Sequence, residues 1–265
     1  MKAILSALAV TVTGLLAGLL GLLVRKGAAF VTVDFLLGLP ARAGQSGGIL
    51  PVLVSTGLLV GGALLLALPL GAGTALYLQE YARPGRLVEG LRALTEALAG
   101  VPSIIFGLFG FSLFVIRLGW GWSLASGSAT LALMLLPTVI RTTEEALAAV
   151  PRELREGAAA LGATRWEAIR RVVLKSAASG VLTGAVLALG RALGETAAVL
   201  LTAGSDLGMP TSPLSPGRTM AVHLYILATE GLSEGRAYAT ALVLVAAVLA
   251  VNLAANLLMA RGQRP

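Results

Sequence analysis

Residues 50–78 read LPVLVSTGLLVGGALLLALPLGAGTALYL, a continuous run that contains no charged side chain. A helix needs about 20 mainly apolar residues to cross the hydrocarbon core of a bilayer. Gly and Pro are tolerated inside such helices, because neighbouring helices satisfy the backbone groups that they free. The run therefore predicts a membrane-spanning helix.

Five further stretches have the same apolar character. They are Ala3–Val24, Leu98–Leu118, Leu124–Ile140, Ala177–Ala203 and Ala237–Ala260. The first is too long for the apolar region of a signal peptide and lacks a clear cleavage site, so it is predicted to be retained. Pro102 predicts that its helix is broken in the first turn or begins at the proline. The sequence thus predicts an all-α membrane protein with about six transmembrane helices.

Composition supports the same class. Hydrophobic residues make up 57% of the 265-residue chain and charged residues 12%, against roughly 25% charged in soluble domains. The net charge is +7, but the basic residues lie between apolar runs without interleaved aromatics, which favours lipid headgroups over nucleic acid. The chain has no Cys and a single His, His223, so neither disulfides nor a His-based metal site is expected.

The basic residues also predict an orientation. If the N-terminus is cytoplasmic, thirteen of the twenty Lys and Arg residues lie on that side, which favours cytoplasmic N- and C-termini. These residues are Lys2, Arg83, Arg86, Arg92, Arg141, Arg152, Arg155, Arg165, Arg170, Arg171, Lys175, Arg261 and Arg264. The charged stretch 80–92 is then a solvated cytoplasmic connection. Residues 206–236 form an outer loop, whose later part is expected as a short helix at the surface.

The expected organisation has three parts. Residues 1–49 comprise an N-terminal transmembrane helix and an outer loop, residues 50–260 a main membrane domain, and residues 261–265 a cytoplasmic tail. Within the main domain, residues 141–175 form the longest cytoplasmic connection.

This connection predicts two short helices separated by a turn. Pro151 suits the start of the first helix and Gly162 suits its end. Thr164 and Glu167 have the spacing of a capping box, which predicts that the second helix begins near Arg165. Small side chains in residues 157–160 would allow another surface to approach closely. The result is a compact cytoplasmic knob.

The knob resembles the EAA loop of ABC importer permeases. Glu156, Gly157, Ala158 and Gly162 match that pattern, with Gly157 where the family has Ala; Val172 and Leu174 follow at matching offsets, and Lys175 replaces a Pro. Three further segments resemble the permeases of the Pst phosphate importer, the PstA type more than its PstC sibling. These segments are Gly100–Gly110, Arg141–Glu145 and Gly190–Thr196.

The resemblance implies a type I ABC importer permease fold (MetI-like) and a membrane subunit of an ATP-driven phosphate importer. It implies a second permease subunit (PstC-like), an ATPase dimer (PstB-like) that docks on the knob, and an extracytoplasmic phosphate-binding protein (PstS-like). The chain itself would be no enzyme and would bind no cofactor, with ATP and Mg held by the ATPase. The implied location is the bacterial cytoplasmic membrane.

Two charged residues, Arg191 and Glu195, lie inside the predicted span Ala177–Ala203. A charge at mid-bilayer costs about 2.5–3.5 kcal/mol on insertion scales, so such residues are usually functional. On one helix they would share a face, either as an internal ion pair or as part of the substrate pathway. Arg offers planar donors suited to phosphate, and Glu could accept from protonated phosphate but not from sulfate.

Gly180, Gly184, Gly190 and Gly194 form two G-x-x-x-G spacings on the same span. They predict close helix packing, either within the chain or against a second permease, with the second permease favoured.

Three alternative functions remain open at this point. They are a PstC-type or other oxyanion permease, an ion-coupled secondary transporter that uses Arg191 and Glu195 as a relay, and a purely structural membrane scaffold. The secondary transporter would work without an ATPase.

Overall fold

The computed structural model describes residues 1–262, and most of these residues are helical. The helices are α1 Lys2–Gly27, α2 Val33–Leu37, α3 Leu50–Leu76, α4 Arg86–Ala99, α5 Ser103–Gly110, α6 Leu124–Ala148, α7 Arg152–Ala160, α8 Arg165–Ala168, α9 Leu174–Leu193, α10 Ala197–Ala203, α11 Met220–Thr229 and α12 Glu234–Gly262. The π-helical turns are η3 Tyr77–Tyr81, η4 Phe111–Arg117 and η5 Ile169–Val173, and the 3₁₀ turns are η1 Ala28–Phe30 and η2 Arg42–Gly44. Two short antiparallel strands complete the list, β1 Pro40–Ala41 and β2 Ser46–Gly47.

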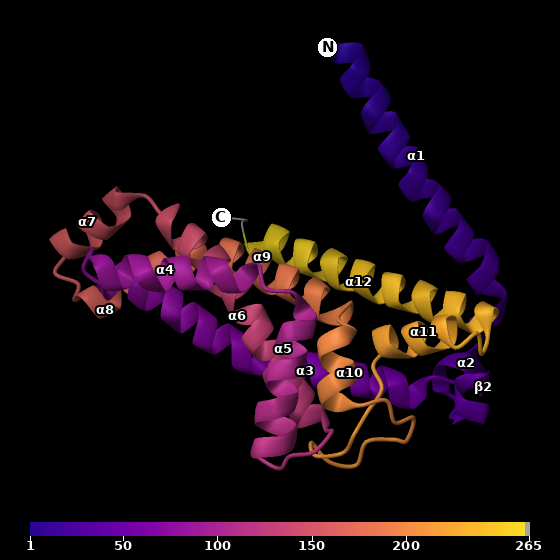
Figure 1. The fold of residues 1–265 in the computed structure, drawn as a ribbon. Coiled ribbons are helices and arrows are strands. Elements are labelled where there is room, and N and C mark those ends of the chain that lie inside the picture. Colours follow the sequence, from indigo (N-terminus) through magenta and orange to yellow (C-terminus); the bar gives the residue numbers. More distant parts are fainter. Residues whose placement is uncertain (263–265) are drawn as a thin grey trace.

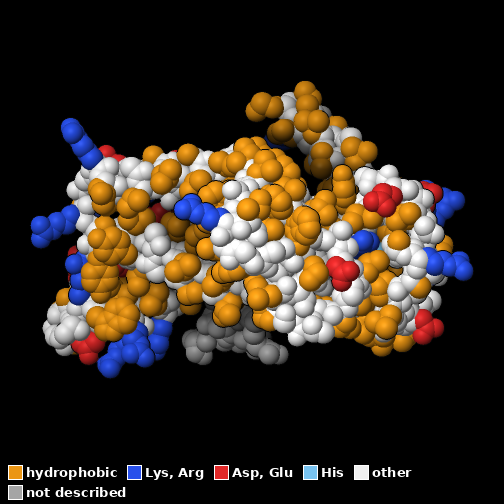
Figure 2. Space-filling view, turned by 60° about the horizontal axis from the view of Figure 1, so that its bottom comes forward, with side chains coloured by type: hydrophobic (Ala, Val, Ile, Leu, Met, Phe, Trp, Pro, Cys, Tyr) orange, Lys and Arg blue, Asp and Glu red, His pale blue; other side chains and the backbone are white. Residues whose placement is uncertain are grey.

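Within the described residues, five helices are long and apolar enough to cross a membrane, and the number is six if the bent pair of α4 and α5 with η4 counts as one span. This confirms the all-α membrane fold predicted from the sequence. Figure 1 shows α7 and α8 at one end of the long axis and α2 and β2 at the other. Charged side chains gather towards the two ends, and apolar side chains cover much of the face between them (Figure 2).

The core lies where α3, α6, α9 and α10 meet. Leu59, Leu131 and Leu135 are fully buried there. Ser128 of α6 donates its hydroxyl hydrogen to the backbone oxygen of Leu59 on α3 at 2.9 Å. A polar side chain inside an apolar helix thus makes a hydrogen bond between helices, which helps to hold α3 against α6.

Helix α1 is attached differently from the others. It packs mainly against α12, and its apolar window has no buried residue. Figure 1 shows it leaning away from the remaining helices. Its apolar surface is suited to lipid or to another membrane subunit.

Three predicted spans differ from the structure. The helix of Leu124–Ile140 continues to Ala148, through the charged residues that follow Ile140. The stretch Leu98–Leu118 is not one span: α4 and α5 meet at a bend of 101° at residues 100–102. The stretch Ala177–Ala203 is broken between α9 and α10.

The connection predicted for residues 80–92 is largely exposed, as expected, with Val88 its one buried residue. It is also partly helical, since α4 begins at Arg86 with an amphipathic sequence. Arg92 pairs with Glu144 of α6 at 3.0 Å, and the side chain of Glu80 is only 10% exposed. The connection is therefore solvated but attached to the neighbouring helices at these points.

The segment 206–236 contains a short helix as expected, but the helix is not at the surface. Met220, Val222 and His223 of α11 are buried. A Cβ on Gly44 would lie 2.7 Å from Cε1 of His223, so the turn between β1 and β2 rests directly on the imidazole. Glycine is required there, because Gly44 also has a φ of +95°.

The expected tail begins inside a helix. Helix α12 runs to Gly262, and residues 263–265 lie outside the described part of the chain.

Candidate functional site

The knob has the predicted two-helix form. Helix α7 begins after Pro151 and α8 at Arg165, and Thr164 and Glu167 form the expected capping box. Gly162 lies between the helices with φ +82°, a conformation that L side chains rarely adopt. The geometry of this turn follows from Gly162 and the capping box together.

Four residues were predicted to carry the contact between the knob and a partner. Glu156, Gly157 and Gly162 are exposed, and a Cβ on either glycine would meet no atom within 4 Å. Ala158 instead packs inward at 9% exposure. The first three residues are accessible to a partner, whereas Ala158 holds α7 against the remaining structure.

The knob also carries exposed apolar side chains at positions outside the EAA-loop pattern. Leu161 is 91% exposed, and Leu154 and Trp166 are about half exposed. Apolar side chains that gather at a charged, water-facing end mark a protein interaction surface. The knob is therefore suited to docking against another subunit.

A break separates α9 from α10 and lies between the two residues predicted for the pathway. Arg191 is in the last turn of α9, Gly194 caps that helix, and Glu195 follows outside it. Oε1 of Glu195 accepts a hydrogen bond from the backbone N–H of Ala198 at 3.2 Å and so caps α10. The expectation that Arg191 and Glu195 share one helix face is wrong. Gly194 was the signal for the break.

Arg191 has no recorded hydrogen bond or ion pair through its side chain within residues 1–262, and it is exposed on the isolated chain. The ion-pair interpretation therefore has no support in the structure. An Arg side chain on an apolar helix requires an anion, a polar partner or water.

The depth of Arg191 follows from the packing of α9 on α6. A Cβ on Gly180 would lie 2.5 Å from Cβ of Ala146, and one on Gly184 would collide with Thr142. The two helices are thus antiparallel, and the register places Arg191 level with Leu135. At 1.5 Å per residue, Leu135 lies about 16 Å from the first residue of α6, Leu124. Arg191 is therefore level with the apolar part of α6, well inside the helix.

The glycines of α9 do not all face the same way. Gly180 and Gly184 pack against α6 of the same chain, so the expectation that they face a second permease is wrong for this pair. A Cβ on Gly190 would meet nothing within 4 Å, and one on Gly194 would meet only a backbone oxygen of its own turn. These two leave an open surface beside Arg191.

Two half-helices lie side by side next to this break. Helix α5 begins after Pro102, and α10 begins after Glu195. A Cβ on Gly107 would lie 2.8 Å from Cα of Ala198, so the two backbones are in close contact. Discontinuous membrane helices of this kind form substrate sites in many transporters.

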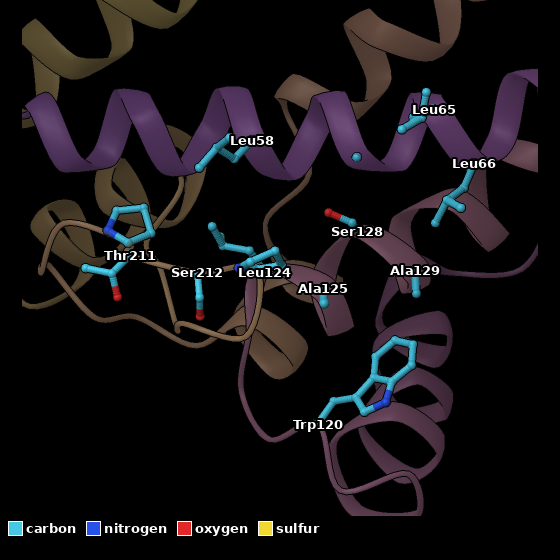
Figure 3. A pocket seen from close by; sticks show the side chains of 13 residues that line it. Leu58, Leu65, Leu66, Trp120, Leu124, Ala125, Ser128, Ala129, Thr211 and Ser212 are labelled. Atoms are coloured by element: carbon cyan, nitrogen blue, oxygen red, sulfur yellow. The ribbon is translucent and has the colours of Figure 1, made fainter.

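Two cavities beside α6 are lined without charged side chains. One of about 560 Å³ lies between α3, α6, Trp120 and residues 210–213. Figure 3 shows Leu58, Leu65 and Leu66 on one side of it and Ala125 and Ala129 on another. Another cavity, of about 420 Å³, lies between α4, α5 and α6 and is lined by apolar side chains and Thr95. Neither contains a charged residue that could bind an oxyanion.

Sequence patterns also missed an ion pair at the base of the knob, Arg155 with Glu80, at 2.8 Å. The two residues are 75 positions apart, and neither belongs to a recognisable motif. Nothing in the linear sequence could have paired them.

Comparison with known proteins identifies the family. The model of the binding-protein-dependent transport system inner membrane component family matches residues 67–263, about three quarters of the chain. The chain belongs to this family.

Its curated relatives cover most of its length. The probable ABC transporter permease protein YqgI of Bacillus subtilis is 34% identical, over 94% of this chain and 90% of that protein. The phosphate transport system permease protein PstA of Haemophilus influenzae is 36% identical, over 87% of this chain and 82% of that protein. The resemblance to PstA-type permeases is therefore confirmed by whole-chain similarity.

Solved structures show the same fold. A bacterial alginate ABC transporter, in complex with a periplasmic protein, matches with a TM-score of 0.70 at 18% identity, covering 98% of this chain and 93% of that one. The methionine ABC transporter MetNI matches with a TM-score of 0.63 at 20% identity, covering 82% of this chain and 95% of that one. The chain therefore has the type I ABC importer permease fold, and as a family member it is a membrane transport subunit.

Proposed function

We propose that this permease is the PstA-type membrane subunit of an ATP-driven phosphate importer. The observation that carries the proposal is Arg191, a cation level with the apolar part of α6 without a recorded partner among residues 1–262, beside a broken helix. The relatives named as phosphate permeases supply the substrate class.

Arg191 contacts the passing anion in this account. Its guanidinium remains charged at any physiological pH and presents parallel N–H donors that match two phosphate oxygens. Glu195 contributes by capping α10 and so fixing the break, and its second oxygen has no recorded hydrogen-bond partner in the described chain. A protonated phosphate can donate to that oxygen, whereas sulfate cannot.

The open surface around Gly190 and Gly194 is proposed to face a second, PstC-like permease. The pathway then lies between the two subunits, with Arg191 at the seam. A phosphate-binding protein outside the membrane would deliver the substrate to this seam.

The knob is proposed to dock on an ATPase dimer through Glu156, Gly157 and Gly162. Hydrolysis of ATP, with its Mg²⁺, would belong to that dimer, so this chain would bind no cofactor and catalyse no reaction. The knob is then cytoplasmic, and the positive-inside count supports cytoplasmic N- and C-termini in a bacterial cytoplasmic membrane.

The test is uptake of labelled phosphate in cells that lack their own importer and express the complete complex. Excess sulfate is present throughout. We expect uptake with the intact chain and a loss of at least about tenfold with Arg191→Gln, because one charge-assisted hydrogen bond in such a site contributes about 1.5–3 kcal/mol.

The matched control is Thr183→Ser, an exposed polar position about two turns earlier on the same helix, α9. This change keeps the hydroxyl that bonds to the backbone oxygen of Ser179, so the variant should transport normally. Normal transport by an assembled Arg191→Gln complex would show that Arg191 is not on the pathway. Sulfate uptake in place of phosphate would overturn the substrate assignment.

A further inference from the structure

Helix α3 ends in the π-helical turn η3. Residues from both helices of the knob, α7 and α8, contact this turn. Arg155 of α7 and Arg165 of α8 both bind Glu80, although the two arginines flank the Gly162 turn. Single π-helical turns are rare and often lie at functional sites. Glu80 is thus the residue at which both arms of the knob, the helices α7 and α8, contact the end of α3.

Arg155 contacts three acceptors, in η3, in α6 and in the connection after α6. Its Nη2 donates to Oε1 of Glu80 at 2.8 Å and to the backbone oxygen of Leu147 at 2.9 Å, and its Nη1 donates to the backbone oxygen of Val150 at 2.6 Å. The side chains of Arg155 and Glu80 are 25% and 10% exposed. A planar guanidinium can serve this arrangement, whereas the single ammonium of Lys cannot reach all three acceptors with the same geometry.

Arg165 makes the second contact. It donates from Nη2 to the backbone oxygen of Glu80, and its guanidinium lies 4.9 Å from the ring centroid of Tyr81. Because both arginines hold the same turn, the knob and the end of α3 form one unit.

The two arms of the knob connect differently to the membrane helices. Helix α8 continues through η5 into α9, so displacement of this arm passes into α9 along one helix. Helix α7 is separated from α6 by residues 149–151 and has no such continuous connection. The contact between Arg155 and Glu80 supplies a direct route from α7 into α3.

We propose that Glu80 and Arg155 are positioning residues that make α3 move together with α9 when a docked ATPase displaces the knob. The inference rests on the proposed function, since it requires an ATPase on the knob. It adds a mechanical connection between α7 and α3 that is independent of the substrate.

The fold does not depend on this ion pair alone. Leu147, Val150, Val173 and Ala177 form a buried apolar cluster that holds the base of the knob against the ends of α6 and α9. Removing one charge at Glu80 should therefore weaken the transmission of movement and leave the helices assembled.

The chain has no cysteine, so a single introduced thiol can report on a chosen helix. A fluorophore on Thr74→Cys reports on α3, and one on Ser176→Cys reports on α9; both positions are exposed. The complete complex is prepared with each label, and the fluorescence change on adding ATP and vanadate is measured.

With Glu80 intact, we expect both labels to respond. With Glu80→Gln, we expect the response on α3 to fall at least about fivefold, the lower range of measured coupling between sites, while the response on α9 remains. The matched control is Glu145→Gln, which removes an exposed ion pair with Arg141 inside α6 and should leave both responses unchanged.

Equal responses on α3 with and without Glu80→Gln would overturn the inference, and so would loss of both responses, because Glu80 would then act on docking. If the Glu80→Gln complex does not assemble, Arg155→Lys provides the same test with the charge retained. Failure of the proposed function would give a different result. The complex with the intact chain would then show no fluorescence change on adding ATP, or would show the change without transporting phosphate.

Discussion

At the scale of single residues, the position of Arg191 depends on two glycines that lie below it. Gly180 and Gly184 set the register of α9 on α6, and that register places Arg191 level with the apolar part of α6. The charged residue could be recognised from the sequence, but its depth could not, because depth depends on which helix the glycines contact.

Gly184→Ala tests this packing. The added methyl would collide with Thr142, so we expect the folded state to lose about 1–3 kcal/mol, as for other overpacked sites. Gly190→Ala is the control, because its Cβ would meet nothing within 4 Å in this chain. The measurement is the thermal unfolding midpoint of each purified chain in detergent. Equal midpoints would show that α9 does not pack on α6 in this register.

His223 gives the outer end a dependence on pH. Burial, together with the positive charges of Arg218 and Arg236, lowers the pKa of His223 to about 4 from an ordinary value near 6.5. Its folded pKa lies below its unfolded pKa, so stability is fully present above about pH 6.5 and is lost as the pH falls towards 4. The total loss is at most about 3 kcal/mol.

We therefore expect the unfolding midpoint to fall between about pH 7 and about pH 4.5, and to fall less in His223→Leu. The variant loses no recorded hydrogen bond of the described chain, since Nδ1 of His223 is buried without a partner. The same pH dependence in the variant and the intact chain would assign the effect to other groups.

At the scale of elements, the knob was predictable because its signals are local. Pro151, Gly162 and the capping box of Thr164 and Glu167 each act within one turn of helix, and the structure has both helices where these signals place them. The bend at Pro102 also has a local signal, because the proline predicts that a helix begins there, and α5 does begin at Ser103. The break after α9 has a weaker signal in Gly194, because the apolar run continues through that position.

Gly162→Ala tests the shape of the knob. Alanine at φ +82° is strained by roughly 1–2 kcal/mol, so we expect the turn to distort and the ATPase to bind more weakly. Gly90→Ala is the matched control: it lies in α4 with open space around its Cβ, and alanine there favours the helix by about 1 kcal/mol. Affinity of the purified ATPase for membranes that contain the two permeases is the measurement. Equal weakening by both variants would contradict the role of the turn.

At the scale of the whole molecule, the surface has regions with different proposed uses. The exposed apolar face of α1 and the open surface beside Arg191 are proposed to contact lipid and a second permease, and the knob is proposed to contact the ATPase. No one surface accounts for transport alone. The chain is proposed to carry movement from the knob, through α9 and α3, to the break where Arg191 lies.

The most direct measurement uses proteoliposomes that contain the complete complex, with the knob facing the lumen. ATP is enclosed, and the binding protein with labelled phosphate is added outside. The account predicts that phosphate accumulates only when ATP is enclosed, and that a proton or sodium gradient does not replace ATP. Accumulation driven by an ion gradient without ATP, or ATP hydrolysis without any phosphate entry, would contradict it.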